Sequence, residues 1–290
     1  MPELPEVETI RRDLEKFLIG KKVEKIRVED SKVVIGSKKT WEKALLDKEL
    51  EQIQRRGKLL AFLFTGDVYI LIHLKMTGQL IYQQKSHLVA GGHPFSRKSQ
   101  EEAIGGSLPN KFSRLIIEFN GGKLFFNDIR RFGYAKLTDD KGWEKAKEKF
   151  GLEPLTKNFK LKDFKALFTN RKAPIKAVLL NQSLIAGLGN IYVDESLFFS
   201  GIDPRRKAFK LKDKEKDRLF QVIVKVLKQA ISKRGTTFSN YRDSQGEKGN
   251  FSSQLKVYGR EGEKCFKCNG LVEKIKVAGR GTHFCPKCQK

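Results

Sequence analysis

Residues 59–74 read LLAFLFTGDVYILIHL, and this stretch decides the fold class. Two short runs of aliphatic, β-branched and aromatic residues flank the turn signal Thr65-Gly66-Asp67, a pattern typical of two strands joined by a tight turn. Runs of the same kind recur on both sides with no helical pattern between them: VEKIRV at 23–28, KVVIG at 32–36, RLIIEF at 114–119, KLFF at 123–126 and GYAKL at 133–137. Seven or eight such strands predict an antiparallel sandwich or barrel, and we expect a β-sandwich.

A helix is expected before these strands and a long loop among them. Apolar residues recur at helical spacing in residues 5–18, and Pro5 suits the first helical position because its missing N–H would be unpaired there anyway. Glu6 and Glu8 then fall in the first turn, where they complement the helix dipole. Residues 86–109 are rich in polar residues and glycine, so we expect a long mobile surface loop there.

The pattern becomes helical after residue 154. Residues 159–168, 175–180 and 192–199 predict three helices, and the turn Gly187-Leu188-Gly189-Asn190 joins the last two. Residues 219–231 give the clearest amphipathic pattern, closed by Gly235. We therefore expect an α+β chain with an N-terminal domain at 1–153, a helical region at 154–240 and a C-terminal segment at 241–290.

Charge and hydropathy narrow the class of protein. The 290 residues hold 59 Lys and Arg against 34 Asp and Glu, for a net charge of +25, and 39% of them are hydrophobic. Residues 155–290 carry +18 of that charge, which is typical of binding to a phosphate backbone, although a general solubility charge is the alternative. The acidic start and the lack of an apolar run of about 18 residues argue against a secreted or membrane protein. We expect a cytoplasmic protein with a polyanionic partner and no membrane association.

The cysteines form the strongest local motif. They occur in the last 26 residues as two Cys-x2-Cys pairs with sixteen residues between them: Cys265, Cys268, Cys285 and Cys288. Each pair can present two thiolates from a tight turn, so four sulfurs can surround one Zn²⁺ ion. Two disulfides or four unrelated thiols are the alternatives, which a cytosolic chain disfavours. Four thiolates leave no open ligand position, so we expect a structural zinc.

The residues between the pairs are expected to form a β-hairpin with basic side chains. Arg280 lies in a Gly279-Arg280-Gly281 tip, where glycine on each side lets the backbone approach a ligand closely while the guanidinium reaches forward. We expect His283 to be a surface histidine, because the thiolates complete the metal shell. His73, which follows an apolar run, is expected to have a structural role.

The first residues suggest a catalytic chemistry. Removal of Met1 would leave Pro2 as a secondary amine with a pKa of about 8, so part of it is unprotonated at neutral pH. Such an amine condenses with C1′ of a deoxyribose to give an iminium ion, and the adjacent Glu3 could supply a proton to the ring oxygen or the leaving base. Glu6 lies one turn further on and could order the site. An ordinary processed terminus with ordinary acids at a helix start is the alternative.

Six short motifs occur in order along nearly the whole chain. They are MPELPEVET at 1–9, QRRGK at 54–58, HLKMTG at 73–78, DIRRFG at 128–133, GLGNIY at 187–192 and VYGR at 257–260. Together with the cysteine module they resemble the bacterial formamidopyrimidine-DNA glycosylases, which are 8-oxoguanine DNA glycosylases. The resemblance implies a helix–two-turn–helix DNA-binding region followed by a zinc-finger hairpin.

The resemblance also implies a role for each matching residue of the active site. Pro2 is then the Schiff-base nucleophile and Glu3 the general acid for base excision, with Glu6 ordering the site. Lys58 assists β-elimination and Arg280 assists δ-elimination, and both also contact phosphate.

Further matching residues are implied to contact DNA. Asn190 resembles a phosphate-binding residue, and its place at a helix start suits that role. Lys172 resembles a DNA-contacting lysine, and Lys176 is a weaker candidate. A glycosylase takes its target base out of the stack, and three residues match the family's trio that fills the gap: Met76, Arg130 and Phe132.

The chain departs from the family pattern in two places. Where the family often has a histidine, this chain has Lys111-Phe112-Ser113-Arg114, so Lys111 or Arg114 could replace that DNA contact. The expected loop at 86–109 is also longer than usual.

The sequence thus predicts a monomeric DNA glycosylase and AP lyase of base excision repair, located at the nucleoid of a bacterial cytosol. It would excise oxidised purines, 8-oxoguanine and formamidopyrimidines, from damaged double-stranded DNA through a Schiff base and β,δ-elimination, with one structural Zn²⁺. The segment 237–258 is expected to determine lesion recognition. An enzyme for oxidised pyrimidines and a catalytically silent DNA-binding protein are the alternatives.

Overall fold

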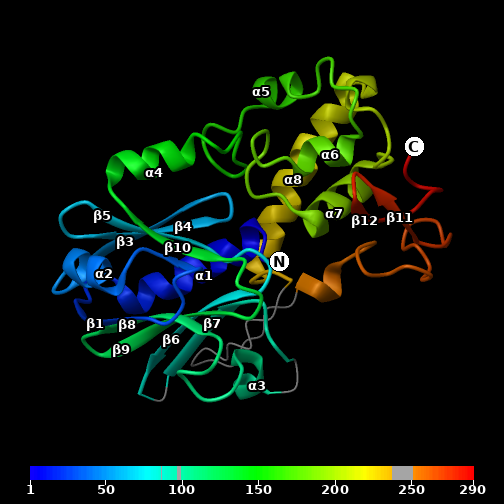
Figure 1. Cartoon of the computed structure of the whole chain (residues 1–290). Coiled ribbons are helices and arrows are strands. Elements are labelled where there is room, and N and C mark those ends of the chain that lie inside the picture. The colour runs from blue at the N-terminus through cyan, green and yellow to red at the C-terminus, as the bar shows by residue number, and fades with distance from the viewer. Residues whose placement is uncertain (86, 97–98, 237–250) are drawn as a thin grey trace. The chain divides into compact units, whose positions relative to one another are not determined.

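The computed structural model describes residues 1–85, 87–96, 99–236 and 251–290, and it divides into two units (Figure 1). The first unit comprises Met1–Glu148 together with residues 233–236, and the second comprises Lys149–Ser232 and Phe251–Lys290. Each unit has a hydrophobic core of its own. Residues 237–250 of the segment expected to determine lesion recognition lie outside the described residues.

The first unit is a β-sandwich of two five-stranded sheets. One sheet has the order β1 (Val23–Val28), β8 (Ser113–Phe119), β9 (Gly122–Asp128), β6 (Gly78–Gln84), β7 (His87–Gly92), and the other β2 (Val34–Ile35), β10 (Tyr134–Thr138), β5 (Val68–His73), β4 (Leu59–Phe64), β3 (Leu50–Arg56). Neighbouring strands are antiparallel, apart from the parallel pair β2 and β10. The predicted sandwich is confirmed.

The hairpin of β4 and β5 follows from the stretch 59–74. Phe64 pairs with Val68 across the turn, and Gly66 and Asp67 both take positive φ there, of 80° and 56°. Five of the six residues of β4 are buried, which explains why the strand is apolar throughout instead of alternating. The ring of Phe64 lies 6.5 Å from that of Phe119 in the other sheet, so the two sheets share one core.

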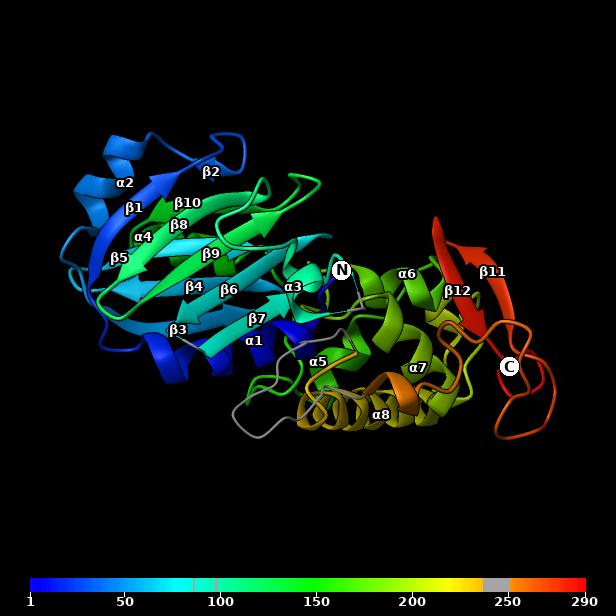
Figure 2. The ribbon, with the colours of Figure 1, turned by 90° about the horizontal axis from the view of Figure 1, so that it is seen from below.

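Helix α1 (Leu4–Leu18) contacts β7 and β3, which are edge strands of the two different sheets, and so covers one side of the sandwich (Figure 2). The expected apolar face is present, since Val7, Ile10 and Leu14 are buried in the core. Pro5 was expected at the first helical position, but Glu3 is the N-cap residue, so Pro5 is the second residue of the helix. Helix α2 (Lys38–Leu45) contacts β1, and α4 (Asp140–Lys147) contacts β5.

Two expectations for this unit were wrong. The region 23–137 contains α2 and α3 (Gln100–Ile104), although no helix was expected there. The described part of 86–109 is not one long loop, because β7 pairs with β6 and α3 follows. Close packing explains the glycine content: a Cβ on Gly91 would lie 2.2 Å from Cγ1 of Ile10 on α1. A strand that must approach a helix so closely cannot carry the bulky side chains that usually mark a strand.

The second unit is helical and ends in a hairpin. Its helices are α5 (Leu161–Ala166), α6 (Ile175–Leu180), α7 (Asn190–Ser200) and α8 (Asp213–Ser232), with 3-10 turns at Ala208–Lys210 and Phe251–Gln254. Helix α7 contacts α6, α8 and the hairpin, and most of its residues are buried. It begins directly after the Gly-x-Gly turn, as the sequence predicts. No helix among the residues described here has both the length and the apolar character needed to cross a membrane.

Strands β11 (Glu273–Val277) and β12 (Arg280–Phe284) form the expected hairpin. Ala278 and Gly279 make its two-residue turn, with φ of 49° and 74°. Arg280 was expected in the tip of the turn, but it is the first residue of β12 and pairs with Val277. Its side chain is exposed and forms no ion pair with any residue that the structure describes.

Candidate functional site

The start of the chain is packed among charged side chains of the first unit. Pro2 is buried, and Glu3 and Lys58 are only 2% and 5% exposed. Burial lowers the pKa of the terminal amine on Met1, while the charges of Glu3 and Glu6 raise it and that of Lys58 lowers it. The residues predicted as nucleophile, general acid and elimination-assisting lysine thus lie within electrostatic reach of one amine.

Glu6 uses both carboxylate oxygens to hold main-chain groups. Its Oε2 accepts the N–H of Glu3 at 2.9 Å, and its Oε1 accepts the N–H and the hydroxyl of Thr236 at 2.8 and 3.0 Å. Gly235 has a φ of +83°, and a Cβ there would lie 2.7 Å from Oε1 of Glu6. Glu6 therefore fixes the residue next to Pro2 against residues 235–236.

Lys58 immediately precedes β4, and His73 is the last residue of the neighbouring strand β5. Lys58 follows Gly57 in the two-residue turn between β3 and β4, and the next residue, Leu59, pairs with His73. Burial lowers the pKa of His73 to about 3, helped by the charges of Lys75 and Lys58. The Nδ1 of His73 accepts the N–H of Lys75 at 3.0 Å. A neutral imidazole that accepts a main-chain hydrogen bond agrees with the expected structural role of His73.

The three predicted void-filling residues come together on two neighbouring loops. The Nη1 of Arg130 lies 3.5 Å from the sulfur of Met76, and its Cζ lies 4.6 Å from the centre of the Phe132 ring. All three side chains are exposed. Exposed apolar groups beside a guanidinium form a surface suited to stacking against unpaired bases.

Asp128, which was not among the predicted site residues, holds these two loops. This fully buried carboxylate accepts the hydroxyl of Thr77, which follows Met76, and the N–H of Arg130. Its Oδ2 also accepts the N–H of Gly133 at 2.7 Å. The signal that could have found it is the polar pair at the end of the apolar run LFFND, because an aspartate at such a strand end often bonds the following turn.

Of the two residues suggested as replacements for the family histidine, only Lys111 is exposed. Arg114 is buried, and its Nε donates to the main-chain carbonyl of Asp128 at 2.9 Å. The suggestion that Arg114 contacts DNA was wrong, because this guanidinium supports the loop from inside. Phe112, at the variant position, packs edge-on against Phe95 with ring centres 4.8 Å apart.

In the second unit, Lys172 is exposed before α6, and Asn190 is the first residue of α7. The Nδ2 of Asn190 donates to the main-chain carbonyl of Gly281 at 2.9 Å. Asn190 thus connects the start of α7 with the main chain of Gly281, the residue that follows Arg280.

Two expectations for this unit were wrong. Lys176 was a weaker candidate for a DNA contact, but its side chain is fully buried and its Nζ lies 2.6 Å from Oδ1 of Asp194. His283 was expected at the surface, but it is buried. Its main-chain N–H donates to Oδ2 of Asp194, and its ring Nε2 lies 3.0 Å from a carboxylate oxygen of Glu261. Both residues lie where β12 packs against α7. The sequence of a strand as short as β12 does not show which of its faces is covered by a helix.

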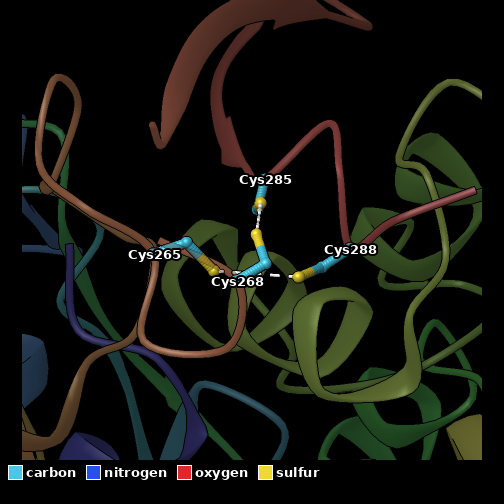
Figure 3. Close-up of side chains that lie close together, drawn as sticks. All are labelled: Cys265, Cys268, Cys285 and Cys288. Carbon is cyan, nitrogen blue, oxygen red and sulfur yellow. Dashed lines mark hydrogen bonds between the residues drawn. The ribbon is translucent and has the colours of Figure 1, made fainter. Parts of the chain in front are cut away.

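The four cysteines converge, as Figure 3 shows. Their sulfur atoms all lie within 4.8 Å of one another, with 3.8 Å between Cys265 and Cys288 and 3.5 Å between Cys268 and Cys285. Four sulfurs placed tetrahedrally at about 2.3 Å from a zinc ion are about 3.8 Å apart, so the cluster fits the ion. A hydrogen bond from the backbone N–H of Gly270 is the largest cause that lowers the pKa of Cys268 to about 7, which favours the thiolate. The chain carries one structural zinc site.

Three family models match successive parts of the chain. Residues 1–135 match the formamidopyrimidine-DNA glycosylase N-terminal domain, and residues 150–241 match the H2TH domain of the same enzymes. Residues 262–290 match the zinc finger found in FPG and IleRS. The first unit, the helical part of the second and the cysteine module therefore each have a counterpart.

Relatives match over the full length. The formamidopyrimidine-DNA glycosylase of Desulfitobacterium hafniense (strain DSM 10664 / DCB-2) is 38% identical over 292 residues, covering 100% of both chains. The crystal structure of a mutant Lactococcus lactis FPG in complex with Fapy-dG containing DNA has a TM-score of 0.85 at 35% identity, covering 100% of both chains. The wild-type Lactococcus lactis FPG in complex with an oxidized pyrimidine containing DNA also matches with a TM-score of 0.85 at 35% identity, covering 100% of both chains. The chain belongs to the formamidopyrimidine-DNA glycosylase family, the DNA glycosylases of base excision repair.

Proposed function

We propose that the chain is a bifunctional DNA glycosylase and AP lyase that removes oxidised purines, 8-oxoguanine and formamidopyrimidines, from damaged double-stranded DNA. The environment of the first amine carries the proposal: burial lowers its pKa, and the charge of Lys58 acts in the same direction. A lowered pKa leaves more of an amine unprotonated, and so nucleophilic, at neutral pH. Removal of Met1 would make the nitrogen of Pro2, itself a buried residue next to Glu3, the first amine of the chain.

In the proposed reaction the Pro2 nitrogen attacks C1′ of the damaged nucleotide. The electron pair of the glycosidic bond leaves with the base, and the nitrogen loses its own proton after it has bonded to C1′. The C1′–O4′ bond then breaks with its electron pair on O4′, the nitrogen lone pair completes the C=N bond of the iminium ion, and Glu3 supplies a proton to the departing base or the ring oxygen. The iminium acidifies C2′, and loss of a C2′ proton expels the 3′-phosphate, a step that we assign to assistance by Lys58. A second elimination, assisted by Arg280, expels the 5′-phosphate.

The remaining predicted residues are proposed to bind the duplex. Met76, Arg130 and Phe132 would fill the space left by the extruded base, with Arg130 facing the unpaired partner base. Phosphates would be contacted by residues from both units: Lys111, Lys172 and Asn190. The proposal of a monomer on DNA is tested by sedimentation of the protein with a lesion duplex, where one protein per duplex is expected.

The lesion class is the finer part of the proposal. The Lactococcus lactis relative has been crystallised with DNA containing Fapy-dG and with DNA containing an oxidized pyrimidine. The second complex keeps oxidised pyrimidines as the alternative substrate class. Single-turnover excision from duplexes with 8-oxoguanine opposite cytosine, Fapy-dG and thymine glycol decides between them, and faster excision of thymine glycol than of both purines would contradict the proposal.

Borohydride trapping tests the nucleophile. Two forms of the chain make a matched pair: one keeps an uncleaved N-terminal tag, and in the other the tag is removed so that Pro2 is the first residue. The tagged form is the control, because an internal proline has no nucleophilic nitrogen. Only the second should give a reduced covalent adduct, and peptide mass mapping should place it on the N-terminal peptide. An adduct on a lysine would contradict the assignment of Pro2. Binding without trapping or cleavage by the chain that begins at Pro2 would favour a catalytically silent DNA-binding protein.

A further inference from the structure

A buried ion pair lies behind the hairpin that carries Arg280. Lys176 on α6 and Asp194 on α7 are both fully buried, with 2.6 Å between Nζ and Oδ1. Burying two charges is costly, and an apolar pair of similar size often serves stability as well or better. The pair therefore calls for an explanation beyond stability.

The partners of this ion pair supply that explanation. The Nζ of Lys176 donates to the main-chain carbonyl of Gly281 at 3.1 Å, and Oδ2 of Asp194 accepts the main-chain N–H of His283 at 2.9 Å. Asn190 lies one helical turn before Asp194 on the same face of α7, and its Nδ2 donates to the same Gly281 carbonyl at 2.9 Å. Strand β12 is thus held at two successive peptide groups, through the carbonyl of Gly281, the residue after Arg280, and the N–H of His283.

Zinc alone does not fix that part of the hairpin. Cys285 follows the end of β12, and Arg280 begins the strand, so about 17 Å of extended chain separates the metal end from Arg280. An isolated two-stranded hairpin is only marginally stable in water. The outer end of this one needs a second point of attachment, and the contacts at Gly281 provide it.

We propose that Lys176 and Asp194 are positioning residues for Arg280, which hold the hairpin main chain so that the guanidinium reaches the phosphate expelled in δ-elimination. The inference rests on the proposed function, in particular on the assignment of δ-elimination to Arg280. Neither residue touches DNA in this proposal. Both act through the Gly281 carbonyl and the His283 N–H.

The test uses the full zinc-loaded chain and a duplex with a preformed abasic site. Lys176→Met alone leaves a buried carboxylate without its ion partner, so the main variant is the double variant Lys176→Met/Asp194→Asn. It removes both charges and the bond from Lys176 to Gly281, while the bond from Asn190 to Gly281 stays and an amide oxygen can still accept from His283. Lys228→Met, an exposed lysine on α8, is the matched control, and Arg280→Gln defines the complete loss of δ-elimination.

Three readouts separate positioning from a structural role: zinc content, yield of the borohydride adduct, and the ratio of β,δ- to β-elimination products. For the double variant we expect zinc content equal to that of the wild type and adduct yield within twofold, but a product ratio at least fivefold lower. The Lys228→Met ratio should equal that of the wild type. A parallel fall of zinc, adduct and both products would show a structural role and overturn the inference.

Failure of the inference can be told apart from failure of the proposed function. If Arg280→Gln lowers the ratio and the double variant does not, only the positioning role is overturned. If Arg280→Gln leaves the ratio at the wild-type value, the assignment of δ-elimination to Arg280 is wrong, and the positioning role is overturned with it.

Discussion

Replacing Glu8 with glutamine should destabilise the first unit at neutral pH and much less at acidic pH. The buried carboxylate of Glu8 accepts hydrogen bonds from Arg11, Arg12 and Arg55 at 2.7 to 3.1 Å. Burial alone would raise its pKa, but the three guanidinium groups outweigh burial and lower the pKa to about 2. Glutamine keeps the size of the side chain and one acceptor but loses the charge that these groups surround.

The magnitude follows from the pKa. A fall from 4.5 to about 2 corresponds to about 3 kcal/mol, and solvent around the half-exposed Arg12 reduces this to about 2 kcal/mol. Because the folded pKa lies below the unfolded one, this stability is fully present above the unfolded value and is lost as the pH falls toward 2. The gap in unfolding free energy between the wild type and Glu8→Gln should be about 2 kcal/mol at pH 7 and about half of that at pH 3.

Urea unfolding followed by tryptophan fluorescence measures this gap. Both tryptophans of the chain, Trp41 and Trp143, are buried in the first unit, so the signal reports that unit. A loss of about 2 kcal/mol should lower the urea midpoint by about 1 M. Glu15→Gln is the control, because Glu15 pairs with Arg11 at a partly exposed position and should cost less than about 1 kcal/mol. Equal stability of the wild type and Glu8→Gln at pH 7, or a gap that does not narrow in acid, would refute the reasoning.

Three further predictions follow from the site. His73→Gln should leave the shape of the pH profile of strand cleavage unchanged between pH 5 and 8, because burial keeps the pKa of His73 at about 3; a shifted inflection in that range would contradict this. Asp128→Ala should lower single-turnover excision from a lesion duplex by at least about tenfold, because the Arg130 and Gly133 N–H groups lose their acceptor, and an unchanged rate would argue against that role. Chelation of zinc should abolish strand cleavage, measured on an abasic duplex. The urea midpoint detected by tryptophan fluorescence should stay constant, because the cysteines and the tryptophans lie in different units. Full cleavage by the metal-free protein would exclude the structural role of zinc.

The sequence predicts strands where a run of aliphatic, β-branched or aromatic residues marks them, including the edge strands β1 and β2, and it misses β3, β6 and β7. Strands β4 and β5 stand out for that reason. Strand β3, LEQIQRR, has one neighbouring strand and buries only Leu50 and Ile53, so its sequence looks like that of a polar segment. Strand β7 escapes notice because its close approach to α1 requires glycine. Both strands also contact α1, which lies far earlier in the chain.

The same limit applies to the site. Motifs of adjacent residues, such as those around Pro2 and the cysteine pairs, can be interpreted from the sequence because their chemistry is local. Asp194 could not be assigned, because its partner His283 lies 89 residues away. For Asp128 the strand end predicts a bond to the following turn, but not the bond to Thr77, which lies 51 residues away. A buried carboxylate that bonds a distant main chain has no local pattern, and in isolation it looks like any surface acid.

Buried carboxylates serve one common purpose in both units. Glu6, Asp128 and Asp194 each accept main-chain N–H groups within three residues of an exposed or reactive residue of the proposed site. Among the described residues, nine Asp or Glu but only three Lys or Arg side chains are buried: Glu3, Glu6, Glu8, Asp13, Asp30, Asp128, Glu153, Asp194 and Glu195 against Lys58, Arg114 and Lys176. A carboxylate at the surface would repel phosphate, whereas a buried one shapes a loop and leaves the outer charge more positive than the net +25. The acids thus order the turns that carry Arg130 and Arg280 without weakening the attraction that brings a polyanion to them.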